Sequence, residues 1–204
     1  MVENQIRTYD VTDQALLAVF AAVPREVFVA GGERATAYLD RLQTARDGKT
    51  RMLPPLVLAR MIQSLEPVPG EKVLAVAGAG YSAAVMAAYG LTVTTLDHDA
   101  GSVRAALAEA GAEGVTVVAG AANAARVAGG PFDLILVEGA AEVEPLALLE
   151  QLRDGGRLGI VMGLGRSGRV MIFRRIGGFV SQARAFDAAA PALPEFANGQ
   201  VFAF

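Results

Sequence analysis

The sequence contains no cysteine and no tryptophan, and His98 is its single histidine. The absence of cysteine excludes disulfide bonds, a thiol nucleophile and thiolate metal ligands. One histidine leaves almost no material for a zinc site or for a serine–histidine–aspartate triad, so we expect no bound metal. Any chemistry of this chain therefore has to rely on carboxylates, hydroxyls, arginines and backbone groups.

Charge of either sign is also scarce. Charged residues make up 19% of the 204 residues, the formal net charge is -3, and Lys49 and Lys72 are the only lysines. Because nucleic-acid and acidic-membrane binders concentrate positive charge, we expect neither partner. The N-terminal segment lacks the apolar core of a signal peptide, which predicts a soluble, cytoplasmic protein. The sequence does not indicate an oligomeric state.

One long run, Val73 to Leu96, carries no charge and reaches the length of a membrane span. Its texture changes along the way, however, from a short apolar run to a glycine turn, an alanine-rich stretch and a β-branched run. This order predicts a strand, a turn, a helix and a second strand rather than a membrane helix.

Strand-like and helix-like stretches alternate after residue 67, which predicts an α/β fold with a mostly parallel sheet. The expected strands are Lys72–Ala77, Leu91–Leu96, Val115–Val118, Phe132–Val137 and Arg157–Met162, and the expected helices are Tyr81–Tyr89, Gly101–Ala110, Asn123–Val127 and Glu144–Leu152. Apolar runs at 170–173, 179–180 and 201–204 predict antiparallel edge strands near the C-terminal end. Residues 1–66 are expected to form an N-terminal helical extension with a polar loop at Thr44–Pro55, packed with residues 67–204 into one compact unit.

Two features at the ends of the first two predicted strands indicate a ligand site. The first is the turn Ala77-Gly78-Ala79-Gly80-Tyr81, whose small residues let backbone amides approach a ligand at a helix N-terminus. The second is Asp97, which ends the next strand and is placed to accept both hydroxyl protons of a ribose. Each alone has a structural explanation, a tight turn or a helix cap, but together they predict a nucleoside cofactor. Because Tyr81-Ser82-Ala83 follows Gly80 and breaks the pattern G-x-G-x-x-G, S-adenosylmethionine is favoured over a nicotinamide cofactor.

Longer motifs resemble the protein-L-isoaspartate O-methyltransferase family along nearly the whole chain. They are Met1-Val2-Glu3-Asn4-Gln5-Ile6-Arg7, Val23-Pro24-Arg25-Glu26-Val27-Phe28-Val29, Ala37-Tyr38 with Asp40, Gly80-Tyr81-Ser82-Ala83-Ala84-Val85, Pro131-Phe132-Asp133, Leu148-Leu149-Glu150-Gln151-Leu152, Gly155-Gly156-Arg157-Leu158 and the ending from Phe186 to Phe204. The resemblance implies a Rossmann-like, S-adenosylmethionine-dependent methyltransferase fold with rearranged C-terminal strands. It also implies protein repair, in which a methyl group passes to the carboxylate of isoaspartyl residues in damaged proteins and S-adenosylhomocysteine is released.

The chain departs from the family pattern at several site positions. Leu53 (or Met52, if the register slips by one) stands where the family has a serine that contacts the reacting carboxylate. Alanines stand in place of the acid on the first strand (Ala75), the first glycine of the turn (Ala77) and the aspartate that follows Gly120 and holds the adenine amine (Ala121). The ribose acid remains, as Asp97.

Three further residues are candidates for the site. Arg51 lies in the loop that would face the peptide and can pair with its carboxylate. His98 can lie over the adenine, and Glu138, at the end of the fourth strand, can repel a carboxylate acceptor or select a different one. Each also has an ordinary explanation as a solvated or structural side chain. Two alternatives to the repair enzyme therefore stay open: a methyltransferase-fold protein that binds without turnover, and a methyltransferase with another acceptor.

Overall fold

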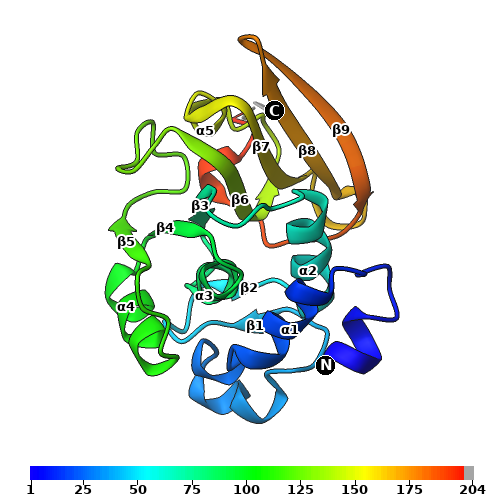
Figure 1. The fold of residues 1–204 in the computed structure, drawn as a ribbon, viewed down its shortest axis with the longest axis vertical. Helices are drawn as coiled ribbons and strands as arrows, with labels where there is room; N and C mark the ends of the chain where they lie inside the picture. Colours follow the sequence, from blue (N-terminus) through cyan, green and yellow to red (C-terminus); the bar gives the residue numbers. More distant parts are fainter. Residues whose placement is uncertain (200–204) are drawn as a thin grey trace, which may run out of the picture.

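The computed structural model describes residues 1–199 and shows a seven-stranded sheet with helices packed against it (Figure 1). The strands are β3 (Lys72–Val76), β4 (Thr92–Asp97), β5 (Thr116–Ala119), β6 (Phe132–Ala141), β7 (Leu152–Met162), β8 (Arg169–Ile176) and β9 (Phe179–Asp187), in the spatial order β5-β4-β3-β6-β7-β8-β9. The first five strands of this order run parallel, β8 pairs antiparallel with β7, and β9 pairs antiparallel with β8. The predicted α/β sheet with antiparallel edge strands is confirmed.

The central strands are apolar because both faces of the sheet are covered. In β3, Val73 and Ala75 pack into one hydrophobic cluster, whereas Leu74 and Val76 pack into a second cluster on the other face. Every residue of β6 is buried. A parallel strand buried on both sides reads as a continuous apolar run, which explains the charge-free segment at 73–96.

That charge-free segment forms most of β3, all of α3 (Tyr81–Ala88) and most of β4, so the prediction of a strand, a turn, a helix and a strand is confirmed. Within residues 1–199, none of the helices combines the length and the apolar character that crossing a bilayer requires.

The other α-helices are α1 (Gln14–Ala22), α2 (Pro55–Ser64), α4 (Ala100–Glu109) and the short α5 (Leu146–Leu149). Local sequence sets their starts: the side chains of Asp13 and Asp99 accept hydrogen bonds from the backbone amides of Leu16 and Ser102 at the N-termini of α1 and α4. Shorter helical turns lie at η1 (Val2–Ile6), η2 (Arg25–Val27), η3 (Gly31–Thr36), η4 (Gly165–Ser167) and η5 (Pro194–Phe196).

The first 66 residues share a hydrophobic cluster with the sheet. Leu17 of α1, Phe28 after η2 and Leu58 of α2 belong to the same cluster as Val73 and Leu134 of the central strands. Figure 1 shows α1, α2 and α3 gathered below the strands, with the β8–β9 hairpin projecting at the top of the view. This packing places the segment before α2 beside the start of α3.

Three local predictions were wrong. The helix expected at Asn123–Val127 is absent, because the Gln151 side chain takes the backbone groups that a helix would use: it accepts from the Val127 amide and donates to the Ala124 carbonyl. The helix expected at Glu144–Leu152 is confined to α5, and β7 already begins at Leu152. The segment Thr44–Pro55, expected to be a loop, contains most of a small hairpin formed by β1 (Gln43–Thr44) and β2 (Arg51–Met52). The strand expected at 201–204 lies outside the described residues.

Candidate functional site

The order of the strands reverses at β3, which has β4 on one side and β6 on the other. Ligands of open parallel sheets bind at such a reversal, beyond the carboxyl ends of the strands. A cavity of about 270 Å³ lies there. Its walls come from the loop at 49–51, from Ala77, Asp97, His98 and Glu138 at the strand ends, and from a C-terminal segment at 191–195.

The turn between β3 and α3 is held in an unusual backbone conformation. Ala77 and Ala79 adopt left-handed φ angles of 59° and 52°, and Gly80 has a φ of 88°. For an alanine this conformation costs about 1–2 kcal/mol, so contacts around the turn have to stabilise it. One such contact is the hydrogen bond from the Ala79 amide to Asp97 Oδ2, at 3.1 Å.

Asp97 is buried, with 4% of its surface exposed, at the carboxyl end of β4. Its Oδ2 accepts the amide of Ala79, and its Oδ1 accepts the amide of Asp99 at 3.2 Å. Burial raises the pKa of Asp97, and the two amides offset part of that effect. Each oxygen of a carboxylate has a second lone pair, so Asp97 can accept two more hydrogen bonds from the cavity side.

Glu138 is a second buried carboxyl group at the cavity, with 2% of its surface exposed. Neither of its oxygens has a hydrogen-bonding partner among residues 1–199. Burial raises the pKa of Glu138 to about 7, although the nearby Ser82 hydroxyl and the Arg25 charge act in the opposite direction. The side chain can therefore exist in either protonation state near neutral pH.

Arg25 is a functional candidate that sequence reasoning missed. It is fully buried, and it donates from Nε to the Ala37 carbonyl at 3.0 Å and from Nη2 to the Leu53 carbonyl at 2.7 Å. Its guanidinium also lies 4.6 Å from the centre of the Tyr81 ring. Arg25 thus ties the loop before α2 to the first residue of α3. In the sequence, the only indication of this role is that Arg25 belongs to the motif Val23-Pro24-Arg25.

The structure brings some of the predicted site residues together and separates others. Arg51, Ala77, Asp97, His98 and Glu138 line the cavity. The other predicted site residues do not belong to its lining: Leu53 and Tyr81 are buried in the hydrophobic core, Gly78 and Gly80 lie within the turn, and Gly120 and Ala121 follow β5.

The C-terminal segment at 191–195 was not predicted as part of the site. It pairs with the end of β6, because the Ala140 amide donates to the Pro191 carbonyl at 2.7 Å and the Leu193 amide donates to the Ala140 carbonyl at 2.9 Å. Further along, the Glu195 carboxylate contacts His98 Nε2, and the Asn123 side chain donates to the Glu195 carbonyl. The segment therefore spans the cavity from β6 to the loops after β4 and β5.

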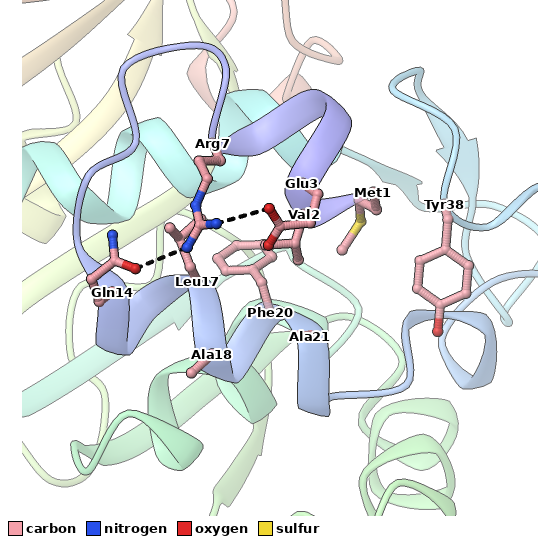
Figure 2. A pocket seen from close by; sticks show the side chains of 10 residues that line it. All are labelled: Met1, Val2, Glu3, Arg7, Gln14, Leu17, Ala18, Phe20, Ala21 and Tyr38. Atoms are coloured by element: carbon pink, nitrogen blue, oxygen red, sulfur yellow. Dashed lines mark hydrogen bonds and ion pairs between the residues drawn. The ribbon is translucent and has the colours of Figure 1, made fainter.

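A larger cavity of about 550 Å³ lies between η1 and α1 (Figure 2). Its charged groups pair with each other, since Arg7 donates to the Glu3 carboxylate at 2.8 Å and to the Gln14 side chain at 3.0 Å. None of its lining residues belongs to the turn after β3 or to the ends of β4 and β6. We therefore place the candidate site in the smaller cavity.

Solved structures share this fold. A protein-L-isoaspartate O-methyltransferase from Plasmodium falciparum, in complex with S-adenosyl-L-homocysteine, superimposes with a TM-score of 0.77 over 93% of this chain and 94% of its own, at 18% sequence identity. A second structure, described as a protein-L-isoaspartate O-methyltransferase, has a TM-score of 0.78 over 91% of this chain and 62% of its own, at 22% identity.

Sequence comparison supports a closer relationship. The protein-L-isoaspartate O-methyltransferase of Methylorubrum populi is 39% identical over 80% of this chain and 78% of its own length, and that of Koribacter versatilis is 31% identical over 92% and 86%. The sequence profile of one family matches residues 1–189. The chain belongs to that family, the protein-L-isoaspartate(D-aspartate) O-methyltransferases.

Proposed function

We propose that this chain is an S-adenosylmethionine-dependent O-methyltransferase that methylates the carboxylate of isoaspartyl residues in damaged proteins. The main observation in support is the position of Asp97. This buried carboxylate ends β4, accepts a hydrogen bond from the Ala79 amide in the turn after β3, and lines the cavity. Family membership and the names of the relatives support the reaction. We further propose that the reaction takes place in the cytoplasm.

The residues at the cavity fit a nucleoside cofactor. Asp97 has lone pairs left for two ribose hydroxyls, and Ala77, in the left-handed turn, lines the same cavity. The residues after β5 stay close to β4, because the Gly120 amide donates to the Asp97 carbonyl at 3.1 Å. These groups would hold the ribose and adenine.

The cofactor supplies a methyl group that its sulfonium already activates, so the protein mainly has to align the two reactants. The loop at 49–51 contributes Lys49 and Arg51 to the cavity wall, and their positive charges attract a carboxylate acceptor. Arg51 is positioned by its hydrogen bond to Thr44 Oγ1 at 2.9 Å. Arg51 is therefore our candidate for the contact that the family makes with a serine hydroxyl.

Two measurements test the proposal. Calorimetric titration with S-adenosylmethionine and S-adenosylhomocysteine tests the cofactor, and a radiolabelled methyl-transfer assay compares an isoaspartyl peptide with its normal aspartyl counterpart. We expect binding of both ligands and label only on the isoaspartyl peptide. Binding without label on either peptide would favour a different acceptor, and absence of binding at millimolar ligand would leave a non-catalytic protein.

A further inference from the structure

The Glu138 carboxyl group has no partner for its charge. Both of its oxygens are buried, and neither forms a hydrogen bond within residues 1–199. An ionised carboxylate in such surroundings is costly unless a cation or several hydrogen-bond donors compensate it. This arrangement suits a site that receives a positively charged group from a ligand.

The side chains that face Glu138 do not supply this compensation. The Arg25 charge, on η2, favours the ionised form of Glu138, and Arg25 Nη1 has no hydrogen-bond partner within residues 1–199. Its Nε and Nη2 donate to backbone carbonyls, however, and Arg25 forms no ion pair with Glu138 in the described part of the chain. On α3, Tyr81 and Ser82 carry only neutral hydroxyls. Asp97, on β4, has the same charge as Glu138 and opposes its ionisation.

The fold makes room for this carboxylate beneath the turn. Val76 of β3 pairs with Val137 of β6, so Glu138 comes one step beyond the last pair, next to the start of the turn. A Cβ atom at Gly78 would lie 1.8 Å from Glu138 Oε1 and 2.8 Å from Ser82 Oγ. The carboxylate thus takes up the space that a side chain at position 78 would need.

Asp97 and Glu138 therefore approach one cavity from opposite sides of β3, on β4 and β6. We propose that Glu138 binds the α-ammonium group of the amino-acid portion of the cofactor, while Asp97 binds its ribose. The inference rests on the proposed function, because it takes an S-adenosyl amino acid as the ligand. It assigns Glu138 to the cofactor and leaves Lys49 and Arg51 to the methyl acceptor.

The raised pKa of Glu138 gives this role a signature in binding. With a pKa of about 7 in the unliganded protein, the carboxyl group is mostly protonated at pH 6 and mostly ionised at pH 8. A cationic ligand stabilises the ionised form, so its binding releases a proton at neutral pH and strengthens as the pH rises. His98, Lys49, Arg51 and Glu195 line the same cavity, and histidine is the residue type whose charge commonly changes between pH 5 and 8.

The test compares two ligands that differ in the ammonium group. S-adenosylhomocysteine carries the amino-acid portion, and 5′-methylthioadenosine lacks it but keeps the ribose and adenine. Both are titrated by calorimetry at pH 6 and pH 8 into proteins that carry His98→Gln, so that histidine does not contribute. The compared proteins are otherwise unchanged, or carry Glu138→Gln or Asp97→Asn.

With Glu138 in place we expect S-adenosylhomocysteine to bind about tenfold more tightly at pH 8 than at pH 6, and 5′-methylthioadenosine to show no such change. Glu138→Gln should weaken S-adenosylhomocysteine at least tenfold at pH 8, abolish its pH dependence and leave 5′-methylthioadenosine unaffected. That last result also shows that the variant is folded. Asp97→Asn should weaken both ligands.

The inference is overturned if Glu138→Gln leaves the affinity for S-adenosylhomocysteine unchanged or weakens both ligands equally. If Glu138→Gln does not fold, the two ligands are compared across pH in the protein that retains Glu138, and equal pH dependence of both overturns the inference. If the protein with its native site binds neither ligand, the proposed function itself fails, so the two failures are distinguishable.

Discussion

Gly78, in the turn after β3, lies against Glu138 of the neighbouring strand β6: a Cβ atom added at Gly78 would lie 1.8 Å from Glu138 Oε1. Position 78 requires glycine because of this close approach. Backbone conformation is not the reason, because Gly78 does not have the left-handed φ angle that Ala77 and Ala79 have. The Glu138 carboxylate and the turn therefore constrain each other, so substitutions at positions 78 and 138 should have coupled effects on stability.

We expect Gly78→Ala to lower the free energy of unfolding by about 1–3 kcal/mol, as overpacking in a buried site does. The added methyl group displaces a buried carboxyl group. In a Glu138→Ala background the same change should cost less, because the obstructing oxygen is gone. Chemical denaturation of the four proteins in this double-mutant cycle measures the coupling, and strictly additive effects would contradict it.

Glu138 should also make stability depend on pH. Burial raises its pKa from an ordinary value of 4.5 to about 7 in the folded protein, so the folded state holds the proton more tightly than the unfolded state does. The stabilisation is complete below about pH 4.5 and is lost as the pH rises through 7. The full shift corresponds to about 3 kcal/mol.

Denaturant titrations of the ligand-free protein and of Glu138→Gln check this dependence between pH 4.5 and pH 8. The stability of the unchanged protein should fall relative to that of the variant by about 3 kcal/mol over this range. Parallel stability curves would show that Glu138 titrates normally. A relative gain in stability at high pH would mean that a resident cation already neutralises it.

The turn after β3 stores strain that glycine would remove. Ala77 holds a φ of 59°, at the position where the resemblance to the family places a glycine. The left-handed conformation of alanine costs about 1–2 kcal/mol, which glycine would avoid. Glycine also raises the conformational entropy of the unfolded chain, and this opposing effect destabilises the folded protein by about 0.4–1 kcal/mol. Ala77→Gly should therefore stabilise the protein by about 0.5–1 kcal/mol in a thermal unfolding experiment, whereas Ala75→Gly, in the middle of β3, should destabilise it.

The parallel sheet could be predicted because its signals are local. Strands buried on both faces leave continuous apolar runs, and glycine turns mark their ends, so β3, α3 and β4 were placed within one or two residues. The helix expected at 123–127 failed because the side chain of Gln151, which is distant in sequence, bonds that backbone. The helix propensity of a short segment cannot predict a hydrogen bond to a side chain so far away in the sequence.

For the candidate site too, the residues set by local sequence could be predicted, and those set by long-range contacts could not. Asp97 could be found because its position at a strand end follows from periodicity. Arg25 and the segment at 191–195 reach the site through contacts between residues far apart in the chain, such as the bond from Arg25 to Leu53 and the pairing of Pro191 with Ala140. Sequence spacing cannot show which carbonyl a buried arginine will bind.

Leu53 illustrates how the structure changes a sequence-based experiment. Its place in the family motif suggests that Leu53→Ser would restore a hydroxyl to the acceptor site. The side chain of Leu53 is fully buried in the hydrophobic core, however, and it does not belong to the lining of the cavity. A serine there would point its hydroxyl into apolar surroundings.

We therefore expect Leu53→Ser to lower the free energy of unfolding by about 2–5 kcal/mol, through lost packing and a buried hydroxyl, and to give no gain in methyl transfer. Arg51→Gln, which changes an exposed side chain at the cavity wall, should leave stability within about 0.5 kcal/mol and reduce the labelling of an isoaspartyl peptide. Thermal unfolding and the radiolabelled assay on both variants separate the two residues. Faster transfer by Leu53→Ser would show that the loop before α2 rearranges to bring position 53 to the acceptor.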